Sequence, residues 1–121
     1  MKRNPVFVAL DTDDIHRATS LLSDIAPHIG GIKVGLEFFT SLGIKGIEEI
    51  KKFNKPLFID LKLYDIPNTV TAALRNILAL KPEYTTLHIS GGRKMLECCT
   101  EEKIKANSST KLIGVTMLTS F

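Results

Sequence analysis

Three charged residues lie close together in the segment D60-L-K62-L-Y-D65. Side chains in a β-strand alternate between its two faces, so Asp60 and Lys62 are predicted to share one face and the two leucines the other. If the leucines contact a layer of helices, the two charges face the interior of the protein. An unpaired buried charge costs several kcal/mol, so they are expected to pair with each other or with a ligand.

The chemistry of such an array follows from its charges. Nearby negative charge stabilises the ammonium form of Lys62, and a fixed ammonium stabilises a carbanion that develops beside it and then protonates it. Asp60 would repel a substrate carboxylate, and this repulsion ends when the carboxylate leaves as CO2. The pattern therefore indicates proton transfer at carbon or decarboxylation. Two alternatives stay open: an internal salt bridge that only fixes the strand, and aspartates that hold a divalent metal ion.

The chain around this segment alternates between short strand-like runs and helix-like segments. Apolar residues spaced three and four apart indicate the helices, and short apolar runs bounded by turn residues indicate the strands. Asp13 or Asp14 is the expected N-cap of the first helix. The predicted strands are 6–10, 31–35, 56–63, 84–90 and 111–118, and the predicted helices are 15–29, 36–54, 69–81 and 93–106.

Five strands separated by four helices, with short connectors, favour a parallel sheet covered by helices, that is, an α/β fold. Both an open doubly wound sheet and part of a (β/α) barrel satisfy this order. The first strand is followed by D11-T-D-D and not by the G-x-G-x-x-G turn of a dinucleotide-binding fold. This difference favours the barrel.

Polar residues occupy the predicted strand ends. In parallel βα folds, reactive side chains lie at the carboxyl ends of the strands and in the loops that follow. The first strand ends in Asp11, the second carries Lys33, the third carries Asp60 and Lys62 with Asp65 just after it, the fourth ends in His88 and Ser90, and the fifth ends in Thr119 and Ser120. Charges from several strands that converge on one mouth are difficult to explain by packing, so an active site is predicted there.

The composition excludes several other classes of function. The 121 residues, 44% apolar and 24% charged, suit one ordinary domain, and no apolar stretch approaches the length of a membrane-spanning helix. Basic and acidic residues are interleaved, so nucleic-acid binding is not expected from the net charge of +3. Adjacent Cys98 and Cys99 are expected to be reduced thiols. Without a recognisable secretory signal, we expect a soluble cytoplasmic protein that has no membrane partner.

Further segments extend the pattern around Lys62. They are VALD ending at Asp11, IKVG around Lys33, D-I-P-N-T-V from Asp65, TLHISGG at 86–92 and GVTMLTS at 114–120. Together and in this order they resemble the bacterial type of orotidine 5′-phosphate decarboxylase, from about residue 5 to the end. The D-x-K-x-x-D core alone also occurs in related sugar-phosphate decarboxylases and aldolases, whereas its extension to D-I-P-N-T with the LTS ending is much more specific.

The resemblance implies a (β/α)8 barrel that works as a homodimer. It implies decarboxylation of orotidine 5′-phosphate to uridine 5′-phosphate in pyrimidine biosynthesis, without metal or organic cofactor. Lys62 is implied as the proton donor to the carbanion, and Asp60 as the carboxylate that faces the departing CO2. Asp65 and Thr69 are implied to reach the neighbouring subunit's site. The other implied substrate-binding residues are Asp11 and Lys33 at the ribose hydroxyls and Thr119 and Ser120 at the pyrimidine, while His88 is a packing and hydrogen-bonding residue.

A barrel of this type has eight strands, and only five are predicted in residues 1–121. The chain is therefore predicted to be the N-terminal part of a single barrel domain. Strands six to eight and the loops that hold the substrate phosphate are expected to be absent, which reduces turnover. Two other hypotheses are kept: a non-enzymatic remnant or half-barrel that pairs with a separate C-terminal piece, and a magnesium-dependent sugar-phosphate decarboxylase of the same superfamily.

Overall fold

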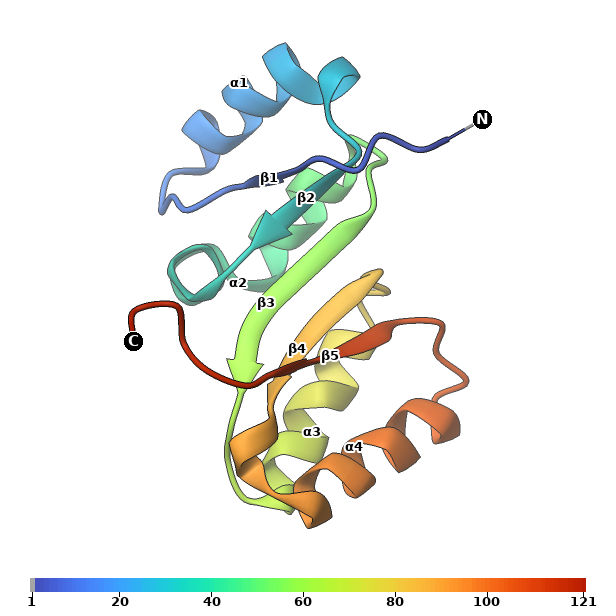
Figure 1. The fold of residues 1–121 in the computed structure, drawn as a ribbon. Helices are drawn as coiled ribbons and strands as arrows, with labels where there is room; N and C mark the ends of the chain where they lie inside the picture. The colour runs from blue at the N-terminus through green and yellow to red at the C-terminus, as the bar shows by residue number, and fades with distance from the viewer. Residues whose placement is uncertain (1) are drawn as a thin grey trace. The chain divides into compact units, whose positions relative to one another are not determined.

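The computed structural model describes residues 2–121, and these form alternating strands and helices (Figure 1). The elements are β1 (Phe7–Ala9), α1 (Ile15–Ile25), η1 (Ala26–His28), β2 (Gly31–Val34), α2 (Leu36–Lys51), β3 (Leu57–Leu63), α3 (Pro67–Leu78), β4 (Tyr84–His88), η2 (Ile89–Gly91), α4 (Arg93–Lys105) and β5 (Lys111–Val115). The strand order in the sheet is β1-β2-β3-β4-β5. The predicted α/β class is confirmed. Within residues 2–121, no helix combines the length and apolar character needed to cross a bilayer.

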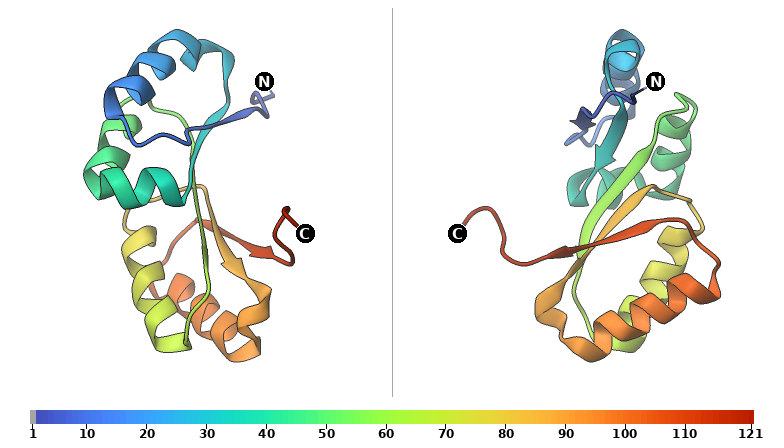
Figure 2. Two further views of the ribbon diagram at one scale, coloured as in Figure 1. Left: turned by 90° about the vertical axis from the view of Figure 1, so that its left-hand side faces the viewer. Right: turned by 45° about the vertical axis from the view of Figure 1, so that its right-hand side comes forward.

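The chain divides into two compact units, Met1–Asp60 and Leu61–Phe121, and β3 runs from the first into the second. In the first unit β1, β2 and the start of β3 pair in parallel, with Ala9 opposite Lys33 and Val34 opposite Ile59. Helices α1 and α2 contact each other and lie on the same side of these strands (Figure 2). The carboxyl ends of β1 and β2 therefore lie next to the part of β3 that belongs to this unit.

The core of the first unit lies between its strands and its two helices. Its buried apolar residues are Leu10, Ala18, Leu22, Ile29, Ile32, Val34, Phe38, Ile47, Ile50, Leu57 and Ile59. Leu57 and Ile59 of β3 belong to this core, so strand alternation places Phe58 and Asp60 on the opposite face. The predicted division of β3 into an apolar face and a face that carries Asp60 is thus observed in the first unit.

Helix α1 begins directly after Asp14. One carboxylate oxygen of Asp14 accepts hydrogen bonds from the backbone N–H groups of His16 and Arg17, at 2.9 and 3.2 Å. These donors have no partner within the first helical turn, so the aspartate stabilises the start of the helix. Of the two predicted N-caps, Asp14 is the one observed.

Replacing Asp14 with alanine is expected to lower the free energy of unfolding by about 1 kcal/mol, because two backbone N–H groups lose their acceptor. Chemical denaturation measures this change. Asp13→Ala is the matched control, because Asp13 is an exposed aspartate one residue outside the cap position. Equal effects of the two substitutions would contradict the assignment of the cap.

The second unit contains β4 and β5 with helices α3 and α4. Thr86 lies opposite Ile113 and His88 opposite Val115 in this parallel pair. The two helices pack against each other and cover one face of the strands (Figures 1 and 2). The core consists of the buried residues Val70, Leu74, Leu78, Leu87, Met95 and Cys99, with Leu63, Leu96 and Leu112 packed against it.

Several elements end at residues other than those predicted. The helix predicted over 15–29 ends at Ile25, because Pro27 in the following 3₁₀ turn has no N–H to continue it. The helix predicted over 69–81 begins at Pro67, since proline suits the first helical turn, and ends at Leu78. The strand predicted over 111–118 ends at Val115, because its partner strand also ends there, at His88.

The two adjacent cysteines are free thiols on α4, as predicted. Cys99 has no exposed surface, and burial raises the pKa of its thiol from 9.0 to about 11, with further contributions from Cys98 and the Glu102 carboxylate. The folded protein therefore disfavours the reactive thiolate of Cys99.

This pKa shift predicts a loss of stability at high pH. Below about pH 9 both the folded and the unfolded thiol are protonated, and the full stability is present. Between pH 9 and 11 the unfolded thiol ionises while the folded one stays protonated, so the free energy of unfolding falls by up to about 1.4 kcal/mol per pH unit. Denaturation across this range is expected to show a shallower fall in a Cys99→Ala variant. Identical slopes would contradict the prediction.

Candidate active site

In the first unit, Lys33 near the end of β2 forms an ion pair with Asp60 in the middle of β3. Lys33 Nζ lies 3.3 Å from Asp60 Oδ2, and the Asp60 side chain is 8% exposed while that of Lys33 is 33% exposed. The two residues come from neighbouring parallel strands, in which Lys33 lies opposite Phe58, two residues before Asp60. A nearly buried carboxylate needs such a partner, because an uncompensated charge at that depth is strongly destabilising.

Asp11 lies at the same end of the first unit. Leu10 N–H donates to the carbonyl of Lys33 at 2.9 Å, which continues the β1–β2 pairing up to the residue before Asp11. A Cβ atom on Gly35 would lie 3.9 Å from Asp11 Oδ1 and 3.5 Å from the carbonyl oxygen of Asp60. Asp11 also lines a pocket together with Arg17 and Glu37. Asp11 therefore follows the strand that pairs with β2, and both its carboxylate and the Asp60 backbone lie near Gly35.

Lys62 belongs to the second unit and has an unusual backbone conformation. Its φ is +51°, which is the left-handed region that non-glycine residues rarely adopt. Its backbone N–H donates to the hydroxyl oxygen of Thr86 on β4, at 2.9 Å. A left-handed conformation costs an L-residue roughly 1–2 kcal/mol. Asp60 and Lys62 were predicted to share one face of the strand because side chains alternate in a regular strand. The positive φ of Lys62 interrupts that regular conformation.

Asp65 and Thr69 lie on the surface of the second unit. Asp65 precedes α3, and its Oδ1 accepts a hydrogen bond from the N–H of Ile66 at 2.7 Å. Thr69 lies in the first turn of α3 and is exposed. Tyr64 and Ile66 on either side of Asp65 are also exposed, at 59% and 66%. This loop therefore presents a carboxylate between two apolar side chains.

Thr119 and Ser120 follow β5 and are exposed. They lie in a turn in which Phe121 N–H donates to the carbonyl of Leu118 at 3.2 Å. His88 at the end of β4 is half-buried, and its ring lies against that of Tyr64 with 5.2 Å between the centroids. The ring contact agrees with the packing role expected for His88. The roles of Thr119 and Ser120 stay predictions.

Sequence reasoning did not single out Thr86. It is 4% exposed and stands in the middle of β4, where a threonine is an ordinary strand residue. One weak signal in the sequence points to Thr86. It lies two residues before His88, a residue at the predicted strand end, so the two share one face of the strand. Its contact with Lys62 depends on how two separate strands pair, so the local sequence does not reveal it.

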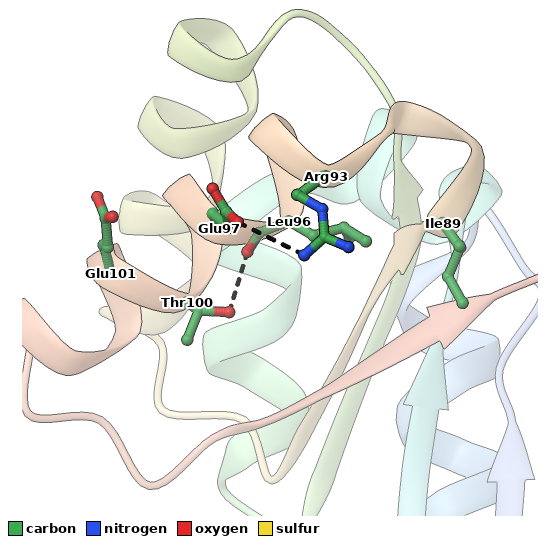
Figure 3. A pocket seen from close by; sticks show the side chains of 6 residues that line it. All are labelled: Ile89, Arg93, Leu96, Glu97, Thr100 and Glu101. Carbon is green, nitrogen blue, oxygen red and sulfur yellow. Dashed lines mark hydrogen bonds and ion pairs between the residues drawn. The ribbon is translucent and has the colours of Figure 1, made fainter.

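A pocket of the second unit lies along α4 (Figure 3). Its lining residues are Ile89, Arg93, Leu96, Glu97, Thr100 and Glu101, and they include no residue predicted for the site. Arg93 pairs with Glu97 at 3.8 Å, and the Thr100 hydroxyl donates to the carbonyl of Leu96 at 2.9 Å. Two of its three charged side chains, Arg93 and Glu97, thus pair with each other within α4. In the part of the chain that the structure describes, no group of three or more His, Cys, Asp or Glu residues is placed to hold a metal ion.

Parallel strands alternate with helices in this chain, and two neighbouring strands carry the Lys33–Asp60 pair. This arrangement defines an α/β protein, a class in which reactive groups gather towards the carboxyl ends of the strands. A family model described as orotidine 5′-phosphate decarboxylase / HUMPS matches residues 4–121. The chain belongs to this family.

The chain is also similar to individual members with that name. It is 49% identical to an orotidine 5′-phosphate decarboxylase of Erythrobacter litoralis and 51% identical to one of a Wolbachia from Brugia malayi, in each case over 97% of this chain and 51% of the relative. A solved structure of orotidine 5′-monophosphate decarboxylase from Methanocaldococcus jannaschii, complexed with the inhibitor BMP, is 30% identical, with a TM-score of 0.84 over 95% of this chain and 53% of that one. The chain spans about half the length of these relatives.

Proposed function

We propose that this chain carries the catalytic charges of an orotidine 5′-phosphate decarboxylase, which converts orotidine 5′-phosphate to uridine 5′-phosphate in pyrimidine biosynthesis. The observation that carries the proposal is the nearly buried Asp60 carboxylate on β3, which pairs with Lys33 on the neighbouring parallel strand and is followed two residues later by Lys62. About half of the residues are identical in relatives that bear this name.

The proposed reaction requires only charges that the chain supplies. The bond between the pyrimidine ring and its carboxylate breaks, the electron pair stays on the ring carbon, and CO2 leaves. The Lys62 ammonium stabilises the resulting carbanion and transfers a proton to it, and the lysine regains a proton from solvent. Asp60 repels the carboxylate in the bound substrate and not in the product. No metal or organic cofactor takes part in these proposed steps.

The remaining roles are proposed from the resemblance and from the positions of the residues. Asp11 and Lys33 hold the ribose hydroxyls, and this is supported by their proximity to Asp60 in the first unit. Thr119 and Ser120 contact the pyrimidine. The protein acts as a cytoplasmic homodimer in which Asp65 and Thr69 reach the partner's site. The exposure of both residues, and of Tyr64 and Ile66 beside Asp65, supports the dimer.

We further propose that residues 1–121 correspond to the N-terminal part of one (β/α)8 barrel domain. The match to about half of each relative's length and the parallel pairings in chain order support this correspondence. The phosphate-holding loops would then belong to the other half. Because binding energy from the remote phosphate lowers the barrier at the reacting carbon, their contribution affects turnover as well as affinity.

The proposal is tested with two proteins. One is the 121-residue chain. The other, termed the hybrid enzyme, joins this chain to the C-terminal part of the Erythrobacter litoralis relative that it does not match. Loss of orotidine 5′-phosphate absorbance is expected in the hybrid enzyme and is expected to persist with a chelator present. We expect little or no turnover from the 121-residue chain alone. A folded hybrid enzyme without turnover would overturn the proposed activity, and chelator-sensitive turnover would favour a magnesium-dependent relative.

A further inference from the structure

We propose that Thr86 is a positioning residue for Lys62. Its hydroxyl holds the Lys62 backbone in the left-handed conformation and thereby sets the direction of the ammonium-bearing side chain. The inference rests on the proposed function for the role of Lys62, while the backbone contact itself is independent of any activity.

Lys62 lies in a different kind of secondary structure from the other non-glycine residues that have positive φ. Residues 2–121 contain four non-glycine residues with positive φ: Asn54, Lys62, Lys81 and Asn107. Three of them lie just beyond the ends of α2, α3 and α4, where the chain usually turns through the left-handed region. Lys62 alone of these four lies within a strand, β3. Helix termination therefore explains the other three and does not explain Lys62.

Glycine would adopt this conformation at no steric cost, but it carries no ammonium group. A lysine at this position therefore adopts an unfavourable backbone conformation that the surrounding structure must hold. Such conformations persist where neighbouring groups over-determine them, and they concentrate at functional sites.

Thr86 is well placed to hold it. The threonine is 4% exposed, and its strand neighbours Thr85 and Leu87 are 0% and 3% exposed. Leu87 is part of the core of the second unit, and β4 is paired with β5 along its whole length. The acceptor for the Lys62 N–H thus stands on a fixed strand, at 2.9 Å. Removing this acceptor takes a part-buried hydrogen bond away from the Lys62 N–H.

The sign of φ determines where the side chain points. A residue in the regular strand conformation projects its side chain along the alternating pattern of its neighbours, whereas a left-handed residue breaks that pattern. The hydrogen bond to Thr86 therefore favours one of two directions for the Lys62 side chain. An ammonium that must reach a developing carbanion is sensitive to this choice, since a displacement of about 1 Å can cost a hundredfold in rate.

NMR spectroscopy of the 121-residue chain tests the backbone contact. In the unmodified chain we expect the strong intraresidue amide-to-Hα NOE of a positive φ at Lys62, and slow exchange of its amide proton. Thr86→Val, which keeps the shape and removes the acceptor, is expected to weaken this NOE and to speed exchange about tenfold or more. Thr86→Ser is expected to restore both. Thr85→Val, on the adjacent buried residue, is the matched control and is expected to leave both unchanged at Lys62.

Kinetics of the hybrid enzyme test the positioning role. Thr86→Val is expected to lower kcat about tenfold or more with KM nearly unchanged, and Thr86→Ser is expected to recover most of the rate. An unchanged NOE and amide exchange at Lys62 in Thr86→Val would overturn the backbone contact, and an unchanged kcat would overturn the positioning role. Absence of turnover in every hybrid enzyme would overturn the proposed function, and the NMR result remains a separate test of the contact.

Discussion

The hybrid enzyme with Lys62→Ala is expected to lose turnover of orotidine 5′-phosphate by about a thousandfold or more. A positioned general acid contributes roughly 10²–10⁴ in rate, and a fixed charge beside a developing anion contributes a comparable factor. The alanine removes both contributions at once. The absorbance assay under saturating substrate measures the effect on kcat.

Lys52→Ala is the matched control for this prediction. Lys52 follows α2, its side chain is 69% exposed, and its Nζ pairs with Glu49 at 3.0 Å on the surface. We expect this substitution to leave turnover unchanged, because an exposed ion pair contributes at most about 1 kcal/mol to stability. If the Lys62→Ala enzyme kept a rate within tenfold of the parent, Lys62 would not be the proton donor.

The Lys62→Ala chain also tests the proposed dimer. If Asp65 serves the partner's site, a hybrid enzyme with Lys62→Ala and one with Asp65→Ala are each impaired alone. Random mixing of the two then produces heterodimers in which one of two sites is intact, so about a quarter of the parental activity should return. Recovery after unfolding and refolding the two together is the measurement. No recovery in a verified heterodimer would place Asp65 outside the partner's site.

Asp60→Asn is expected to lower kcat of the hybrid enzyme about a hundredfold or more and to lower KM at the same time. The asparagine keeps the shape of the side chain and removes the charge that repels the substrate carboxylate. A variant that loses ground-state repulsion binds substrate more tightly and turns it over more slowly. Steady-state kinetics give both constants. A fall in kcat accompanied by a raised KM would contradict the repulsive role.

The same substitution is expected to affect stability, because it removes the carboxylate that pairs with Lys33. Breaking a buried pair costs about 3–5 kcal/mol, but Lys33 retains access to water, so we expect about 1–2 kcal/mol here. Asp24→Asn, on the exposed surface of α1, is the control with the same chemical change. When Lys33 is already replaced by methionine, Asp60→Asn should lower the free energy of unfolding by less than it does in the parent chain. An equal loss in both backgrounds would show that the ion pair with Lys33 does not cause the destabilisation.

The alternation of strands and helices could be predicted because it depends on local pattern. Apolar spacing in α1 and the short apolar run of β3 are properties of neighbouring residues, and so is the Asp14 cap. The predicted ends of strands were less accurate where pairing with another strand sets the end. Val115 ends β5 because the opposing strand ends at His88, and no residue near Val115 reveals this.

The sequence by itself determined which chemical groups are available and in which order: Asp11 directly after a predicted strand, then Lys33, Asp60 and Lys62 on two further predicted strands. It also determined the family, because motif order is a property of the chain. Only the tertiary structure decided that Lys33 and Asp60 pair at 3.3 Å, and that Thr86 holds a left-handed Lys62. Strand alternation treats each strand as regular and isolated, whereas both contacts arise between residues more than twenty positions apart, which only the pairing of separate strands brings together.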